Sequence, residues 1–211
     1  MGENLRCELL SWDDVWNLSM IVAKKIRESR YNPDTIIGVT RGGWVPAMNL
    51  SDLLMIKDLL TLKVEHWGVT ATPTGDAKLK FPLSVDLTGK KILLVDDLTD
   101  TGESIELSIE HIKRLNPERI KTATLLHNMR SRFEPDFYAE RRKEWRWIIF
   151  PWNITEDLTN LVNRIPGKER MNPIQLQNAL RKRFDLRIRR KILYEILHWN
   201  DRLRWNCIHT R

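Results

Sequence analysis

The chain has 211 residues, of which 42% are hydrophobic and 30% are charged, and its formal net charge is +7. This length can bury a full core and suits one catalytic domain with a smaller addition, whereas no apolar stretch approaches the ~20 residues of a membrane span. A polar N-terminus argues against a signal peptide, and two widely separated cysteines argue against a disulfide scaffold or a zinc site, so we expect a cytoplasmic protein.

Alternating helical and strand patterns run through the first two thirds of the chain. Apolar periodicity predicts a helix over residues 12–27, a short buried strand over 35–39 and a second helix over about 45–54. Because strands and helices alternate, we predict an α/β fold with a parallel sheet. Further strands are predicted at residues 60–65, 92–95, 120–126 and 147–150.

A glycine loop, Arg41-Gly42-Gly43, follows the first predicted strand. Glycines let the backbone turn tightly and approach a ligand, and the planar guanidinium of Arg41 offers several donors to a phosphate. By itself this tripeptide is just as typical of an ordinary turn between a strand and a helix.

A polar segment over residues 66–80 contains two glycines and a proline and separates two of the predicted strands. Loops of this length in compact domains are usually disordered or functional. We therefore predict a long loop here, which is either disordered or functional.

The segment from Lys91 to Ile105, KILLVDDLTDTGESI, carries the most specific pattern in the chain. Its apolar run is typical of a strand buried on both faces of a parallel sheet, and ligands gather at the carboxyl ends of such strands, where Asp96 and Asp97 stand. Small and hydroxyl-bearing residues then lead into a helical pattern, and a helix N-terminus suits an anionic phosphate. Carboxylates for sugar hydroxyls beside amides for a phosphate indicate a ribose 5-phosphate site.

In this order of strand, paired acids and Thr-Gly turn, the sequence resembles the type I phosphoribosyltransferases. The resemblance covers roughly residues 30–155 and implies the parallel-sheet fold of that family, with phosphoribosyl pyrophosphate (PRPP) as a substrate. It also implies that the segment 66–80 is a mobile loop that closes over the active site.

The resemblance implies a role for each part of the motifs. Asp96 and Asp97 would bind the ribose hydroxyls, and Asp97 would help to position the Mg²⁺ that accompanies PRPP. The pyrophosphate would bind to Arg41, Gly42 and Gly43. The 5-phosphate would bind to Asp100, Thr101, Gly102, Glu103 and Ser104.

Asp100, which opens the phosphate turn, is the candidate catalytic residue. In the similar 6-oxopurine phosphoribosyltransferases, an Asp at this place is proposed as the general base that removes a proton from the purine. A helix-capping role for Asp100 is the alternative, and the two roles are compatible.

The base site is predicted near the last strand, where tryptophans are concentrated. Trp147-Ile148 followed by Pro151-Trp152 resembles the segment that stacks the purine in xanthine-guanine and hypoxanthine-type enzymes, with Trp147 as the platform and Ile148 offering backbone contacts. A hydrophobic core edge would explain the same residues. Asn128 stands where those enzymes have a lysine that reads the 6-oxo group, and its amide can donate or accept. Guanine, hypoxanthine, xanthine and adenine all stay open, with a 6-oxopurine preferred.

Charge separates the end of the chain from the rest. Residues 1–154 hold 22 basic and 22 acidic residues, whereas residues 155–211 hold 13 and 6. We therefore predict a catalytic domain at residues 1–154 and a small basic helical C-terminal extension at residues 155–211. Asn172 before Pro173 is typical of a helix start. The residues predicted to line one face of that helix are Ile174, Leu180 and Phe184.

Two functions of different classes follow. The first is an enzyme, a purine phosphoribosyltransferase of purine salvage that makes a nucleoside 5-monophosphate and pyrophosphate from PRPP and a free purine base. The second is a regulator that senses PRPP or a nucleotide and holds nucleic acid through the basic extension. For the extension itself, a packing or dimerising appendage is the simpler interpretation, and the resemblance implies a homodimer.

Overall fold

The computed structural model describes residues 5–70 and 72–199, which form two compact units. The sheet unit comprises Trp12–Gly68 and Pro73–Trp145, and the terminal unit comprises Met1–Ser11, Val69–Thr72 and Arg146–Arg211. The terminal unit thus joins segments from both ends of the chain. Cys207 lies outside the described residues.

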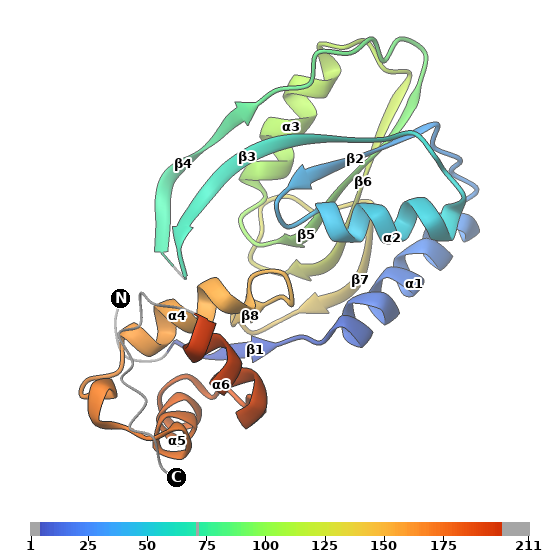
Figure 1. Ribbon diagram of the computed structural model, residues 1–211. Coiled ribbons are helices and arrows are strands. Elements are labelled where there is room, and N and C mark those ends of the chain that lie inside the picture. Colours follow the sequence, from blue (N-terminus) through green and yellow to red (C-terminus); the bar gives the residue numbers. More distant parts are fainter. Residues whose placement is uncertain (1–4, 71, 200–211) are drawn as a thin grey trace. The chain divides into compact units, whose positions relative to one another are not determined.

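A six-stranded sheet with the order β4-β3-β2-β5-β6-β7 forms the centre of the sheet unit (Figure 1). Strand β2 pairs in parallel with β3 and β5, and β6 pairs in parallel with β5 and β7. The parallel α/β fold predicted from the sequence is therefore confirmed. The strands are β2 (Thr35–Thr40), β3 (Leu59–Val69), β4 (Thr72–Phe81), β5 (Lys91–Thr99), β6 (Arg119–Asn128) and β7 (Phe137–Arg142).

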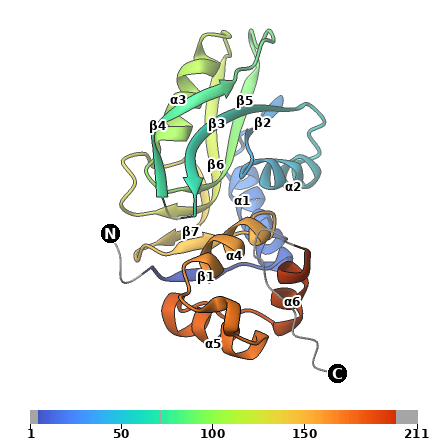
Figure 2. The ribbon, with the colours of Figure 1, turned by 60° about the vertical axis from the view of Figure 1, so that its left-hand side comes forward.

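Helices cover both faces of this sheet. The helix α3 (Glu103–Lys113) lies on one face, and α1 (Trp12–Glu28) and α2 (Trp44–Leu54) lie on the other (Figures 1 and 2). Alternate residues of β5, Ile92 and Leu94, enter the same buried cluster as residues of α3. The continuous apolar run of β5 is explained by this burial on two sides.

Three strands were not predicted, and one was assigned to the wrong sheet. The predicted loop at residues 66–80 is instead the end of β3 and most of β4. Polar residues with two glycines favour a loop, but pairing with β3 at the sheet edge overrides that preference. The predicted last strand, β8 (Trp147–Ile149), pairs with β1 (Cys7–Leu9) in a separate two-stranded sheet. Strand β7 was also missed.

The terminal unit is mostly helical around the β1–β8 pair, in which Cys7 lies opposite Trp147. A buried apolar cluster joins this pair to the helices, with contributions from Ile149, Leu161 and Leu180. Burial in this cluster raises the pKa of Cys7 to about 12, and the nearby Asp157 carboxylate adds to the effect. The helices are α4 (Ile154–Asn163), the 3₁₀ helix η1 (Lys168–Arg170), α5 (Pro173–Phe184) and α6 (Arg190–Trp199).

The start of α5 confirms the predicted helix signal. The Asn172 side chain accepts a hydrogen bond from the Gln175 backbone, and the Gln175 side chain accepts one from the Asn172 backbone, which is a complete capping box. On the predicted apolar face Leu180 and Phe184 are buried, but Ile174 is 48% exposed. Leu176, which was not predicted, is buried on that face instead.

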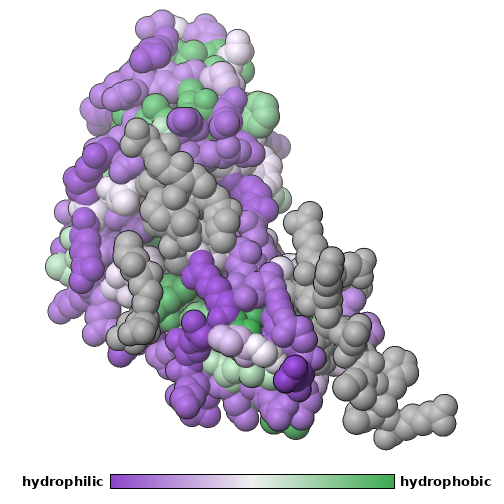
Figure 3. Space-filling view, turned by 90° about the vertical axis from the view of Figure 1, so that its left-hand side faces the viewer, coloured by the Kyte–Doolittle hydropathy of each residue, from purple (hydrophilic) through white to green (hydrophobic). Residues whose placement is uncertain are grey.

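The compact units do not follow the predicted division after residue 154. Strand β8 precedes that boundary but pairs with β1, and both belong to the terminal unit together with α4. The charge distribution carries no information on which strands pair. The face shown in Figure 3 is mostly hydrophilic, with small hydrophobic patches. Among the helices of the described residues, none is long and apolar enough to cross a membrane.

Candidate active site

Two adjacent carboxylates lie at the carboxyl end of β5, as the sequence predicted. Asp96 is 8% exposed, whereas Asp97 is half-buried. The backbone N–H of Asp97 donates to Oδ1 of Asp96 at 2.9 Å. Burial and then the neighbouring Asp97 carboxylate raise the pKa of Asp96 well above its ordinary value. Asp96 is therefore the inner, buried carboxyl of the pair, and Asp97 is the outer one, closer to solvent.

The glycine loop packs directly against this acidic pair. A Cβ atom at Gly42 would collide with the carboxylate of Asp97, and one at Gly43 would lie 2.8 Å from Cα of Asp96. The Gly43 N–H donates to the carbonyl of Val39 at 2.8 Å. Only glycines let the backbone of this loop pass so close to Asp96 and Asp97. The structure thus brings the predicted pyrophosphate loop and the predicted ribose carboxylates together.

The glycine loop begins at Arg41, directly after β2, which ends at Thr40. The peptide bond between Thr40 and Arg41 is cis. The hydroxyl of Thr40 donates to the carbonyl of Leu62 on the neighbouring strand at 3.0 Å. Arg41 is exposed at the start of the loop, beside the position where the glycines meet the carboxylates.

The predicted phosphate turn, residues 100–104, leads into α3 at the same end of β5. Gly102 is the N-cap, with φ of +95°, and its carbonyl accepts the N–H of Glu106 at 3.0 Å. The hydroxyl of Thr101 accepts the N–H of Glu103 at 3.4 Å. The first turn of α3 thus directs backbone N–H groups toward the end of the sheet, where an anion is favoured.

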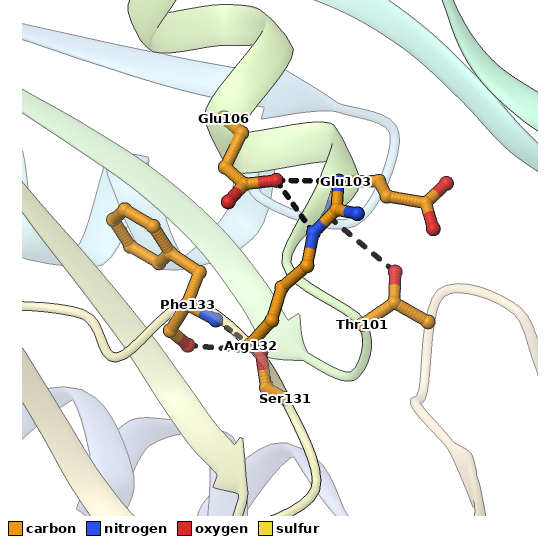
Figure 4. A network of polar contacts seen from close by, with 6 residues as sticks. All are labelled: Thr101, Glu103, Glu106, Ser131, Arg132 and Phe133. Carbon is orange, nitrogen blue, oxygen red and sulfur yellow. Dashed lines mark hydrogen bonds and ion pairs between the residues drawn. The ribbon is translucent and has the colours of Figure 1, made fainter.

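A loop that follows β6 holds this turn in place (Figure 4). The backbone N–H of Arg132 donates to the carbonyl of Thr101 at 3.3 Å. The guanidinium of Arg132 binds Glu106 on α3, with Nε and NH2 at 2.8 and 2.6 Å from Oε2. The hydroxyl of Ser131 donates to the carbonyl of Phe133 and accepts the N–H of the same residue. Sequence reasoning missed these residues because no motif links the loop to a turn about 30 residues earlier.

The candidate general base is held by two side chains. Oδ1 of Asp100 accepts a hydrogen bond from the amide of Asn128 at 2.9 Å, and Oδ2 accepts one from the indole N–H of Trp145 at 3.4 Å. Asn128 is 4% exposed, and its Oδ1 accepts the N–H of Arg130 at 3.1 Å. The structure therefore brings Asp100 and Asn128 together, and it adds Trp145, which the sequence analysis missed.

Trp147 and Ile148 belong to the terminal unit. Their backbone lies in β8, opposite Cys7 and Glu8 of β1, and both side chains are half-buried. The indole N–H of Trp147 donates to Oδ1 of Asp157 at 2.8 Å. The predicted role of these two residues in binding the base stays a prediction.

Comparisons with known proteins agree with the motifs. A family profile described as "Phosphoribosyl transferase domain" matches residues 8–157. Xanthine-guanine phosphoribosyltransferase from Cereibacter sphaeroides is 32% identical over 152 residues, which cover 69% of this chain and 86% of the relative. Hypoxanthine-guanine phosphoribosyltransferase from Aquifex aeolicus is 29% identical over 146 residues, covering 66% and 79%.

A solved structure supports the same assignment. The purine phosphoribosyltransferase from Pyrococcus horikoshii Ot3 superimposes with a TM-score of 0.60 at 35% identity, covering 70% of this chain and 94% of that one. The fold of the sheet unit is therefore the type I phosphoribosyltransferase fold, as the resemblance implied. Together with the acidic pair, the glycine loop and the Thr-Gly turn at one end of the sheet, these matches show that the chain belongs to the phosphoribosyltransferase family.

Proposed function

We propose that the protein is a purine phosphoribosyltransferase of purine salvage. It transfers ribose 5-phosphate from PRPP to a free purine base, forms a nucleoside 5-monophosphate and releases pyrophosphate. The observation that carries this proposal is the meeting of the glycine loop, the Asp96–Asp97 pair and the Gly102 turn at the carboxyl end of β5. The three relatives named above are purine phosphoribosyltransferases, and their names indicate the second substrate.

Each part of PRPP has a matching group in the sheet unit. The backbone N–H groups of residues 101–104 and the hydroxyls of Thr101 and Ser104 suit the 5-phosphate. The carboxyls of Asp96 and Asp97 suit the two ribose hydroxyls, which donate to them. The guanidinium of Arg41 and the bare backbone of the glycine loop suit the pyrophosphate, which must be stabilised as it leaves C1.

The donor set also fits Mg²⁺. This ion is usually held by one or two carboxylates together with substrate phosphates and water, rather than by a cage of protein ligands. The outer carboxylate, Asp97, lies beside Gly42 of the glycine loop and would hold the ion, which when bound neutralises charge on the pyrophosphate.

Asp100 is the proposed general base. In the reaction, a ring nitrogen of the purine bonds to C1 of the ribose while the bond from C1 to pyrophosphate breaks, and the base must lose a proton. The Asp100 carboxylate would accept it, and the hydrogen bonds from Asn128 and Trp145 fix the carboxylate before the substrate arrives.

For the purine itself we propose that Trp147 stacks on the ring and Ile148 offers backbone contacts. A 6-oxopurine is the preferred substrate, with Asn128 as a candidate donor to the 6-oxo group. The homodimer, the cytoplasmic location and a ligand at the basic extension stay predictions. The regulator that binds nucleic acid, which was the alternative from sequence, has no support among the relatives named above.

A panel of bases tests the proposal. The protein would be incubated with PRPP, Mg²⁺ and one base at a time, namely guanine, hypoxanthine, xanthine, adenine, uracil and orotate. We expect nucleotide from at least one 6-oxopurine and none from the pyrimidines. Absence of nucleotide with every base would refute the proposed enzyme, and salt-sensitive retention of nucleic acid by the same sample would then favour the regulator.

A further inference from the structure

A buried carboxylate lies in the first turn of α4, within the terminal unit. Asp157 is 3% exposed, although its neighbours Leu158, Leu161 and Val162 all enter the apolar cluster of that unit. A buried carboxylate is costly unless hydrogen bonds replace its hydration. An apolar residue at this position would simply extend the cluster. The reason for an acid there must therefore lie in the hydrogen bonds that Asp157 accepts.

Two donors reach the same carboxylate oxygen. The indole N–H of Trp147 donates to Oδ1 of Asp157 at 2.8 Å, and the hydroxyl of Thr70 donates to the same atom at 2.7 Å. Thr70 is 3% exposed and belongs to the terminal unit, although it lies between β3 and β4 in the sequence. One atom of Asp157 thus links Trp147 to a residue 77 positions earlier in the chain.

Two residues in turn fix Thr70, namely Asn160 in α4 and Arg164, the C-cap residue of that helix. The amide of Asn160 donates to the Thr70 hydroxyl at 2.9 Å, and the guanidinium of Arg164 donates to the Thr70 carbonyl. A hydroxyl has a single proton, and that of Thr70 is directed to Asp157. The bonds therefore form a chain of donors from Asn160 through Thr70 to Asp157, in which each bond polarises the next.

The backbone of Trp147 is fixed independently of its ring. Strand β8 pairs with β1, and the Trp147 N–H donates to the carbonyl of Arg6 at 2.9 Å. The side chain packs on the apolar cluster, and the residue as a whole is half-buried. With the backbone held by β1 and Nε1 held by Asp157, the plane of the indole is set before any ligand binds.

We propose that Asp157 and Thr70 are positioning residues that fix the Trp147 ring for stacking on the purine. The inference rests on the proposed function, because it takes Trp147 as the stacking residue. Neither Asp157 nor Thr70 touches the substrate in this account. A preordered ring spares the cost of ordering it on binding, so loss of the link weakens the binding of the base and leaves the binding of PRPP unchanged.

The substitution Thr70→Val tests the link because it removes the hydroxyl and keeps the shape of the side chain. We expect the KM for the purine to rise about tenfold, with the KM for PRPP and kcat within about twofold of wild type. Thr70→Ser restores the hydroxyl and should restore the purine KM. Thr159→Val is the matched control, since Thr159 is a buried threonine of α4 whose hydroxyl donates to the carbonyl of Thr155 at 2.6 Å.

A spectroscopic readout separates the inference from activity. In ¹⁵N NMR spectra the indole signal of Trp147, identified by its loss in Trp147→Phe, should shift in Thr70→Val and in Asp157→Asn but not in Thr159→Val. Should Thr70→Val fail to fold, Asn160→Ala removes the outer donor and is measured in the same way.

An unchanged purine KM or an unmoved indole signal in these variants would overturn the inference. A wild-type protein that uses no purine would instead refute the proposed function. The indole signal would still report whether Asp157 and Thr70 hold the ring.

Discussion

Gly102 at the start of α3 gives the sharpest stability prediction. Its φ of +95° is unfavourable for any residue with a side chain, which costs about 1–2 kcal/mol when Ala replaces Gly. A Cβ there would also lie 2.5 Å from Cβ of Phe133 and 3.1 Å from Oγ of Ser131, and overpacking of this kind costs about 1–3 kcal/mol. Gly102→Ala should therefore lower the free energy of unfolding by about 2–5 kcal/mol.

Gly89 provides the control for this substitution. It has φ of +72°, but nothing lies within 4 Å of the position of its Cβ. Gly89→Ala should therefore lower the free energy of unfolding only by the cost of a positive φ at a residue with a side chain, about 1–2 kcal/mol. Urea denaturation of both variants measures the two costs, and the difference between them reports the contact with the loop after β6.

The same pair of variants should differ in function. Because a Cβ at Gly102 would collide with Phe133, the turn or the loop after β6 must shift, which displaces the proposed phosphate site. Gly102→Ala should therefore also raise the KM for PRPP, while Gly89→Ala leaves it unchanged. Equal costs of unfolding for the two variants would refute the reasoning, because they would show that Phe133 and Ser131 yield without penalty.

Three further predictions concern the candidate active site. Asp100→Ala should lower kcat by about 10²–10⁴-fold with little change in the KM for PRPP; unchanged steady-state turnover would remove the general-base assignment. Asp96→Asn should weaken PRPP binding but raise the free energy of unfolding at pH 7. The folded-state pKa of Asp96 is raised, so its neutral form stabilises the fold at acid pH. This contribution is lost as the pH rises above the usual carboxyl range. Denaturation across pH should accordingly show a smaller decline for Asp96→Asn than for wild type, and an equal decline would contradict the raised pKa. Arg41→Lys keeps the charge but loses the planar fork of donors, so the KM for PRPP should rise by about tenfold, as measured by initial rates, and a wild-type KM would show that Arg41 does not bind pyrophosphate.

Features that lie in one continuous stretch of sequence were predictable. The strand β5, the acids at its end and the turn into α3 occupy residues 91–113, so their local pattern contains most of the information on their structure. The helix start at Asn172 and Pro173 was likewise predicted from adjacent residues. In each case the interactions that define the feature join near neighbours in the chain.

Features that depend on contacts between distant segments were missed or misplaced. Strand β8 was assigned to the central sheet because its apolar pattern does not reveal that β1 is its partner. Strand β4 was taken for a loop because its edge pairing with β3 overrides the local preference. The bonds from Asn128 and Trp145 to Asp100 join residues 28 and 45 positions apart, so no spacing rule predicts them.

The central claim is that the acidic pair, the glycine loop and the Thr-Gly turn form a site that transfers ribose 5-phosphate to a purine. The most direct test is to measure nucleoside 5-monophosphate and pyrophosphate together, in one reaction with PRPP, Mg²⁺ and hypoxanthine or guanine. The account predicts that both products form in equal amounts, that neither forms without the base, and that both are lost in Asp96→Asn/Asp97→Asn. Pyrophosphate release without a purine nucleotide, or equal product formation by the double variant, would contradict it.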